Sequence, residues 1–413
     1  MSEKRNILMV SMHGDPAAEI GSEEQGGQPI YIKNISRLLS DEYKIDIFTR
    51  KKKESENTVI NLFPEVNVVR IEAGPVEFVP KKELYTHINE FFMGVVRWGE
   101  EHDERYSLIH SHYWYSGIVA LKLRDALEVP VVHNCHSLGR IKYEMLDKEK
   151  PPYADMRLLE EEVILKRANG IVASTPQEVK NILDLYDVSG ENIRLIRAGV
   201  NKDLFRPIDK EKAIEKIEID FENVLLFVGR ITRAKGLSIL IKALKKVKKR
   251  FDEEVKLLVV GGDVSGVMHS EEEERQKRKL KKMLTELGLN DDVKFLGPVE
   301  REKLPYYYAL AEVCVVPSRY ETFGLVAVEA MACGLPVVAS KVGGLEHTIE
   351  HGVSGLHFVP GRADSLAESI LNILKNSQKL KEMRINARKR AARNFSLERT
   401  TKQIKELYDS LIF

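Results

Sequence analysis

Two cations and two carboxylates in the second half of the chain have a spacing suited to an anionic, hydroxyl-rich ligand. Arg230 and Lys235 follow a short apolar run, Val224 to Val228, and Glu321 and Glu329 lie eight residues apart. On a helix that spacing is about two turns, so both carboxylates can face one ligand. Cations at the end of a strand suit a diphosphate, and carboxylates suit sugar hydroxyls. The same spacing also fits an alternative in which the first carboxylate caps a helix and the second lies on the surface.

The stretch from Pro317 to Gly334, PSRYETFGLVAVEAMACG, adds a second feature suited to an anion. A helix is expected to begin between Thr322 and Leu325, and Gly324 would let a ligand approach its free N–H groups. We therefore expect a phosphate-binding site at the end of the preceding strand.

Glycines and a histidine follow expected strands in the first half of the chain. Gly26 and Gly27 would put flexible backbone near a bound anion, and His136 comes directly after an apolar run in HNCHSLG. A lone histidine there also fits a structural role. His133, Cys135 and His136 do not have the spacing of a zinc site, so no metal site is expected.

Short apolar runs alternate with amphipathic stretches along the whole chain, as in strands buried on both faces by helices. The pattern predicts two doubly wound, Rossmann-like α/β domains at residues 1–195 and 205–390, with a last helix in 391–413 that could pack on either. The linker is expected at Asn192 to Ile208. Two such domains side by side are expected to leave a cleft at the carboxyl ends of their strands.

Composition narrows the function classes further. The 64 Lys and Arg against 63 Asp and Glu give a net charge of +1, which gives no general argument for binding nucleic acid or an anionic membrane. No apolar run approaches the roughly 20 residues that span a bilayer, and the start does not resemble a signal peptide. Three cysteines without paired spacing fit a reducing compartment. We expect a cytoplasmic protein that binds small molecules, with no nucleic-acid partner and no membrane span.

Several common phosphate and metal motifs are missing from the sequence, namely GxGxxG, GxxxxGK followed by Ser or Thr, GxSxG, HExxH and Asp-x-Asp. A bound diphosphate would therefore be neutralised by side-chain cations and helix amino termini.

Taken together, these segments resemble the retaining glycosyltransferases of the GT4 family, which have the GT-B fold. The resemblance covers nearly the whole chain and rests on Glu321-x7-Glu329 with its FG, on GLPVVAS, on VGR-x4-K from Val228 to Lys235, and on the amino-terminal GGQ. It implies a nucleotide-sugar donor, expected to be a UDP-hexose, held mainly by the second domain. It implies no required cofactor, and Mg²⁺ is possible without being implied by an Asp-x-Asp pair.

The resemblance also implies roles for residues at the donor. The cations and the amides of the expected helix start would bind the diphosphate, Glu321 the hydroxyls of the transferred sugar and Glu329 the ribose. His136 would contact the sugar near the reacting centre, and the base would lie near Gly297 to Val299. The catalytic residues implied are His136, Glu321, Arg230 and Lys235. The donor-binding residues implied are Gly27, Arg230, Lys235, Glu321, Thr322, Phe323, Gly324, Leu325 and Glu329.

Within this family the amino-terminal domain decides the acceptor, and here it looks most like the bacterial sucrose-phosphate synthases. HGDPAAEIGSEEQGGQPIYIKN and HNCHSLG carry this likeness, although the chain lacks the longer insertion of those enzymes. The carboxyl-terminal half looks more like the inositol-phosphate glycosyltransferases of the mycothiol pathway. Both groups take a phosphorylated acceptor. The acceptor-binding residues implied are Gln28, Lys81, Tyr113, Ser137, Lys142 and Arg157.

The sequence therefore predicts a retaining transferase that moves a hexosyl unit from a nucleotide-sugar to a phosphorylated sugar or polyol, by front-face displacement. The alternative within the family is an inositol-phosphate or other small-acceptor transferase. Alternatives of other classes are a UDP-sugar 2-epimerase, which shares the two-domain plan, and a non-catalytic sugar-nucleotide sensor. The sequence predicts no particular oligomeric state.

Overall fold

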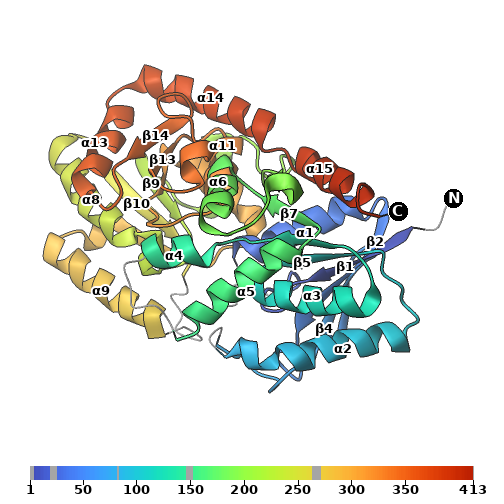
Figure 1. Cartoon of the computed structure of the whole chain (residues 1–413). Coiled ribbons are helices and arrows are strands. Elements are labelled where there is room, and N and C mark those ends of the chain that lie inside the picture. The colour runs from blue at the N-terminus through green and yellow to red at the C-terminus, as the bar shows by residue number, and fades with distance from the viewer. Residues whose placement is uncertain (1–3, 19–25, 81–82, 146–151, 263–270, 413) are drawn as a thin grey trace. The chain divides into compact units, whose positions relative to one another are not determined.

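The computed structural model describes residues 4–18, 26–80, 83–145, 152–262 and 271–412 (Figure 1). Within these residues the chain forms two compact units. The first contains the described residues up to Arg197 and those from Glu398 onward, and the second contains Ala198–Leu397. Both are Rossmann-like α/β units with a parallel or mainly parallel sheet, as the sequence pattern predicts.

An eight-stranded sheet forms the centre of the first unit, in the order β3-β4-β2-β1-β5-β6-β7-β8. Its neighbours pair in parallel, except for β3 and β4, which pair antiparallel. The order reverses between β1 and β5, and ligands of open α/β sheets bind at the carboxyl ends of the strands beside such a point. The strands are β1 (Arg5–Val10), β2 (Tyr43–Arg50), β3 (Val59–Phe63), β4 (Val66–Ile71), β5 (Leu108–His112), β6 (Val131–Asn134), β7 (Gly170–Ala173) and β8 (Ile193–Leu195).

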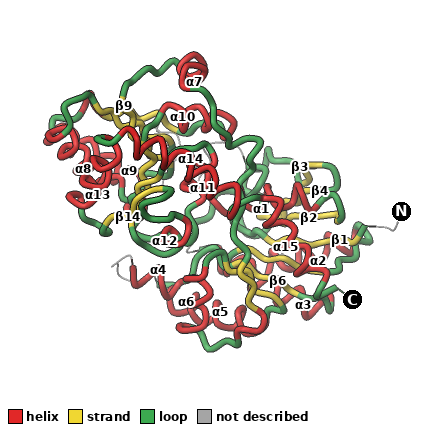
Figure 2. The backbone as a smooth tube through the Cα atoms, turned by 90° about the horizontal axis from the view of Figure 1, so that it is seen from above, coloured by secondary structure: helices red, strands yellow, loops and turns green. Residues whose placement is uncertain are grey.

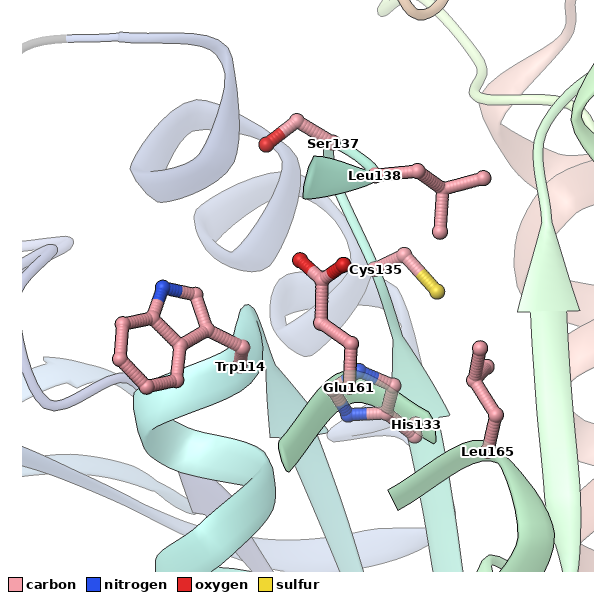
Figure 3. A pocket seen from close by; sticks show the side chains of 7 residues that line it. All are labelled: Trp114, His133, Cys135, Ser137, Leu138, Glu161 and Leu165. Carbon is pink, nitrogen blue, oxygen red and sulfur yellow. The ribbon is translucent and has the colours of Figure 1, made fainter. Parts of the chain in front are cut away.

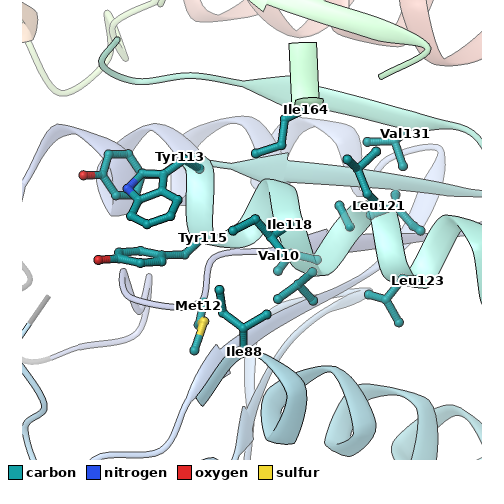
Figure 4. Packing of buried hydrophobic residues seen from close by; sticks show 14 of the residues in the cluster. Val10, Met12, Ile88, Tyr113, Tyr115, Ile118, Leu121, Leu123, Val131 and Ile164 are labelled. Atoms are coloured by element: carbon teal, nitrogen blue, oxygen red, sulfur yellow. The ribbon is translucent and has the colours of Figure 1, made fainter. Parts of the chain in front are cut away.

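Helices cover this sheet because its strands are apolar on both faces. In β1 and β5 nearly every residue is buried, the pattern of a parallel strand between helical layers. Figure 4 shows Ile118 and Leu121 of α3 packed near Val10 and Val131 of the sheet. The helical segments are α1 (Gly27–Leu39), η1 (Leu84–His87), α2 (Ile88–Glu101), α3 (Trp114–Leu127), α4 (Gly139–Met145), α5 (Ala154–Arg167), α6 (Pro176–Leu185), η2 (Gly190–Asn192) and α15 (Leu397–Asp409).

The second unit is built on six parallel strands in the order β11-β10-β9-β12-β13-β14. Here the order reverses between β9 and β12, which are neighbours in the sheet. The strands are β9 (Asn223–Val228), β10 (Val255–Val260), β11 (Val293–Gly297), β12 (Val313–Val316), β13 (Val337–Ser340) and β14 (Gly355–Phe358).

The helices of the second unit include α8 and α13, which lie side by side against the sheet (Figure 2). Buried leucines and isoleucines at helical spacing along α8 form part of the core of this unit. The helical segments are α7 (Lys210–Ile217), η3 (Arg233–Lys235), α8 (Leu237–Arg250), α9 (Glu271–Leu287), η4 (Asn290–Asp292), η5 (Arg301–Lys303), α10 (Leu304–Leu310), α11 (Leu325–Ala332), α12 (Leu345–Thr348), α13 (Ala363–Leu374) and α14 (Ser377–Asn394).

The structure differs from the sequence-based boundaries at two places. The expected linker began at Asn192, but Ile193–Leu195 is β8, the edge strand of the first sheet, because its apolar residues pair with β7. A three-residue strand is too short to give a periodic pattern. Residues 391–394 belong to α14 in the second unit, so the expected terminal segment 391–413 begins inside that helix. The last helix itself starts at Leu397, as the sequence pattern predicts.

The last helix, α15, belongs to the first unit. Tyr408 is fully buried, and its hydroxyl lies 2.6 Å from Nδ1 of His110 on β5. Nε2 of His110 lies 2.7 Å from Oδ1 of Asn134, which can only accept, so the proton of His110 is on Nε2 and Nδ1 accepts from the tyrosine. Burial lowers the pKa of His110 to about 4, so the ring is neutral.

In the part of the chain that the structure describes, no helix combines the length and the apolar character needed to cross a bilayer.

Replacement of Tyr408 by Phe is expected to lower the free energy of unfolding of the first unit by about 1–2 kcal/mol, because Nδ1 of His110 would stay buried without a donor. The two tryptophans of the chain, Trp98 and Trp114, both lie in this unit, so urea titrations followed by tryptophan fluorescence report on it. Lys402→Ala, at an exposed position of the same helix, is the control and should change stability by less than about 0.5 kcal/mol. Equal midpoints for both variants would contradict the assigned hydrogen bond.

Candidate functional site

The two loops that carry the predicted donor cations and carboxylate touch each other in the second unit. The loop after β9 and the loop after β12 are joined by a hydrogen bond from the Arg319 N–H to the Ala234 carbonyl, at 2.7 Å. Gly236 has φ +72°, and a Cβ there would lie 1.9 Å from the carbonyl oxygen of Pro317. Only glycine allows this approach, so Gly236 sets where η3 ends and α8 begins.

Lys235 and Glu321 form an ion pair across these two loops. The Lys235 Nζ lies 2.5 Å from Oε2 of Glu321, which also accepts from the Ser318 hydroxyl at 3.3 Å. The two side chains are 31% and 17% exposed, so solvent still reaches both. Arg230, on the same loop as Lys235, is exposed. The structure therefore brings Lys235 and Glu321 together at the point where the strand order of this unit reverses.

The predicted helix start lies directly after Glu321. Helix α11 begins at Leu325, with Gly324 as its N-cap at φ +91°, so its first N–H groups have no partner within the helix. The backbone of Thr322 and Phe323 packs against a glycine pair, and a Cβ on Gly344 would lie 2.0 Å from the carbonyl oxygen of Thr322. This contact gives a structural reason for the glycines in the sequence VGGL.

Glu329 is buried, and protein groups bind both of its oxygens. Arg301 pairs with Oε1, and the hydroxyl of Tyr308 lies 3.2 Å from Oε2. Arg301 also lies over the ring of Phe205, with 4.8 Å from its Cζ to the ring centroid. The side chain of Glu329 is 3% exposed, so the alternative of a plain surface residue is wrong. No motif in the sequence pointed to Arg301, Tyr308 or Phe205.

In the first unit, Arg157 is the centre of the predicted acceptor residues. Its guanidinium is 1% exposed and donates to Oε1 of Glu161 at 2.6 Å. It also donates to the carbonyl and the hydroxyl of Ser137, at 2.9 and 3.2 Å. The rings of Tyr113 and Tyr143 lie 5.1 and 5.6 Å from its Cζ, as in cation–π contacts. Three residues far apart in sequence, Tyr113, Ser137 and Arg157, thus form one cluster.

The carboxylate that holds Arg157 is itself fixed. Oε2 of Glu161 accepts from the N–H of Gly139 at 2.8 Å and from the hydroxyl of Tyr186 at 2.5 Å. Figure 3 shows this carboxylate beside a narrow cavity in the first unit. The cavity is lined by Trp114, His133, Cys135, Ser137, Leu138, Glu161 and Leu165. No motif in the sequence indicated Glu161, Tyr143 or Tyr186.

Three further predicted residues of the first unit are described, and in the chain they follow β1 or β6: Gly27, Gln28 and Lys142. Gly27 begins α1, and the side-chain amide of Gln28 donates to the Ser11 hydroxyl at 3.1 Å and to the His112 carbonyl at 3.3 Å. Lys142 is half-buried on α4. Lys81 lies outside the described residues.

His136 follows β6 with φ +55°, a left-handed conformation that is uncommon outside glycine. Its Nε2 lies 3.0 Å from Nδ1 of His112. Burial, with a smaller contribution from His133 and His110, lowers the pKa of His136 to about 3. His133 instead bonds to Ser111 at 2.9 Å. Among the described residues no group of three or more His, Cys, Asp or Glu side chains could hold a metal ion.

Both halves of the chain match models of glycosyltransferase families. Residues 25–204 match the family described as Glycosyltransferase Family 4, and residues 209–390 match the family described as Glycosyl transferases group 1. The D-inositol 3-phosphate glycosyltransferase of Corynebacterium jeikeium is 36% identical over 375 residues, which are 89% of this chain and 88% of that protein. Its counterpart in Corynebacterium kroppenstedtii is 34% identical over 98% of this chain and 90% of that protein.

Solved structures agree with this result. Sucrose-phosphate synthase from Thermosynechococcus elongatus has a TM-score of 0.91 and 35% identity, and the match covers 99% of both chains. HepE from Anabaena, solved in complex with UDP and glucose, has a TM-score of 0.79 at 24% identity over 98% of this chain and 100% of that one, which shows the fold alone. The relatives above 30% identity span nearly the whole sequence and are transferases by name, which favours transfer over epimerisation or sensing. The chain therefore belongs to the GT4 family of glycosyltransferases with the GT-B fold, and it is a transferase enzyme.

Proposed function

We propose that the chain is a retaining glycosyltransferase that moves a hexosyl unit from a nucleotide-sugar, a UDP-hexose, to a phosphorylated sugar or polyol. The observation that carries the proposal is that each unit contains a cation paired with a carboxylate. Each pair lies beside residues that follow the strands where the strand order of its sheet reverses. Lys235 with Glu321 is the pair of the second unit, and Arg157 with Glu161 is the pair of the first. Each cation suits one phosphate-bearing substrate.

On binding, the donor would replace the ion pair between Lys235 and Glu321 with its own bonds to both side chains. A partly exposed ion pair is worth about 0–1 kcal/mol, so it can be exchanged at little loss for charge-assisted bonds to a diphosphate. Lys235, with Arg230, would then bind the diphosphate, and Glu321 would accept from hydroxyls of the transferred sugar. The free N–H groups at the start of α11 would add favourable dipoles for the diphosphate.

Transfer with retention would proceed by front-face displacement. As the bond between sugar and diphosphate breaks, negative charge grows on the leaving diphosphate, and both cations and the α11 amides would stabilise it. A diphosphate oxygen would accept the proton of the acceptor hydroxyl as that hydroxyl bonds to the anomeric carbon. His136, neutral because burial lowers its pKa, would contact the sugar as a hydrogen-bonding group.

A phosphorylated acceptor is supported by the Arg157 cluster and by the relatives. The names of the similar proteins contain inositol 3-phosphate in one group and sucrose-phosphate in the other. The match to sucrose-phosphate synthase along 99% of both chains favours a sugar phosphate as the first candidate. The 36% identity to a D-inositol 3-phosphate glycosyltransferase favours inositol phosphate as the second.

A crossed screen tests the acceptor and donor assignments together. UDP-, ADP- and GDP-hexoses are each combined with hexose phosphates, inositol phosphate and the same acceptors without phosphate, and the product is detected by mass. We expect transfer from a UDP-hexose to a phosphorylated acceptor and little transfer to its plain counterpart. Equal rates with and without the phosphate would refute the acceptor proposal, and turnover of the nucleotide-sugar alone into an epimer would refute transfer.

Arg230→Ala and Lys235→Ala are each expected to lower kcat about a hundredfold, which corresponds to roughly 3 kcal/mol of lost transition-state stabilisation. Both cations lie on a loop that solvent reaches, so the fold should be retained. Lys242→Ala, an exposed lysine of the neighbouring α8, is the matched control. Initial rates of UDP release with acceptor present provide the measurement. Near-normal rates in both variants would reject the donor site.

Glu321→Gln tests the role of Glu321 separately from that of Lys235, its partner in the ion pair. The carboxylate competes with a diphosphate for Lys235, so its neutral analogue should bind UDP at least as tightly as the unchanged protein does. Transfer should nevertheless fall, because the amide is a poorer acceptor for the sugar hydroxyls. Calorimetric titration with UDP and the kcat for transfer are the two measurements. Weaker UDP binding together with full transfer activity would contradict both roles.

Arg157→Lys is expected to raise the KM for the phosphorylated acceptor at least about tenfold, because lysine keeps the charge but loses the planar fork that holds Ser137 and Glu161. The KM for the nucleotide-sugar should change little. Arg167→Lys, an exposed arginine on the same helix, is the control. If the preference for phosphorylated over plain acceptor stays the same in Arg157→Lys, the residue does not bind the phosphate.

A further inference from the structure

Four buried or half-buried histidines lie together at the ends of β5 and β6, and one ring nitrogen of His112 has no hydrogen-bond partner within the described segments. His112 is fully buried, its Nδ1 lies 3.0 Å from Nε2 of His136, and its Nε2 has no hydrogen-bond partner among the described residues. The rings of His112 and His136 lie 5.2 Å apart, and the ring of Tyr31 meets both edge-on at 6.0 and 5.5 Å. The two imidazoles are thus fixed against each other by one hydrogen bond.

The direction of that hydrogen bond follows from the two protonation states. Burial keeps the pKa of both rings well below its ordinary value, so each is neutral and carries one N–H. If His112 accepted at Nδ1, its only N–H would be the buried Nε2, for which the described part of the chain offers no acceptor. If His112 donates from Nδ1, only a lone pair is left unpaired at Nε2. Orphaned buried N–H groups are rarer than under-satisfied acceptors, so the second arrangement is favoured.

The direction of donation decides the tautomer of His136. Its Nε2 is then the acceptor, so its own proton lies on Nδ1. The backbone of His136 is in a left-handed conformation at φ +55°, so the position of its side chain depends on support from its neighbours.

We propose that His112 is a positioning residue whose Nδ1–H holds His136 in the neutral Nδ1–H tautomer, so that His136 meets the donor sugar as a hydrogen-bond donor. The inference rests on the proposed function in one respect, the contact between His136 and the sugar. His112 does not touch the substrate in this assignment. It acts through the orientation and the tautomer of the second ring, as supporting groups do for metal-bound histidines.

Nitrogen NMR of the full chain labelled with ¹⁵N-histidine tests the tautomer without any substrate. The signals of His136 are identified by their loss in His136→Gln. The expected result is a protonated Nδ1 and an unprotonated Nε2 for His136 at neutral pH, and the loss of this single pattern in His112→Leu. A proton on Nε2, a cationic ring, or an unchanged pattern in His112→Leu would overturn the proposal.

Kinetics test the consequence for transfer. His112→Leu is expected to lower kcat about tenfold while the acceptor KM is unchanged, because only the group at the sugar is displaced. His112→Asn, whose side-chain amide N–H lies near the position of Nδ1, should restore most of this loss, and His112→Gln should not. His102→Leu, at an exposed position of the same unit, is the control and should match the unchanged protein. Equal loss in His112→Asn and His112→Leu would overturn the proposal.

The two measurements keep the inference apart from the proposed function. If NMR gives the Nδ1–H tautomer but His136→Ala transfers sugar at the normal rate, the proposed contact between His136 and the donor fails and the proposal falls with it. If transfer depends on His136 but its proton lies on Nε2, the donor contact stands and the role of His112 is refuted. If His112→Leu does not fold, two measurements still test the role of His112. They are the NMR tautomer of His136 in the unchanged protein and the kcat of His112→Asn compared with that of His112→Gln.

Discussion

The pairing of Lys235 with Glu321 joins two loops that are 86 residues apart in the sequence, and the surface around it depends on how closely those loops approach. The backbone contact between Gly236 and Pro317 and the hydrogen bond from Arg319 to Ala234 hold the loops together without any charged group. The ion pair is therefore not needed to keep the loops in place. In the proposed function a ligand would replace this pair at little loss of stability, because a partly exposed ion pair is worth about 0–1 kcal/mol.

The first unit uses the same combination of charges in a different environment. Arg157 and Glu161 are buried and bonded to each other, and the pair also bonds to the carbonyl of Ser137 and to the N–H of Gly139. Removing two charges from water costs several kcal/mol, and their attraction offsets this only with good geometry and further hydrogen bonds. A pair of this kind contributes little net stability, and its main effect is to give the guanidinium one orientation. The ion pair of the first unit, Arg157 with Glu161, is thus rigid, whereas that of the second unit, Lys235 with Glu321, is partly exposed and can be exchanged.

The sequence predicted those parts of the molecule that depend on local pattern. The apolar run at Val224 to Val228 became β9, and the strand expected before Pro317 is β12 (Val313–Val316). Arg230 and Lys235 follow the first of these strands, and Gly324 follows the second, as expected. Partners from distant segments could not be predicted, because periodicity reports which face of an element is buried and not what covers it. Glu161 as the partner of Arg157, and Tyr408 as the partner of His110, are of this kind.

Glu329 illustrates why a motif residue and its chemistry can be predicted while its environment cannot. Its spacing from Glu321 suggested two similar carboxylates facing one ligand, yet Glu329 is buried and bonded to Arg301 and Tyr308, whereas Glu321 is partly exposed. A carboxylate has about four lone-pair positions, so two protein donors leave acceptor positions for the ribose hydroxyls that the proposed donor would present. Arg301 and Tyr308 therefore orient this carboxylate without saturating it. Donor binding would break the pair at Glu321 and leave the one at Glu329 intact, so the two glutamates of one motif would respond differently to the same ligand.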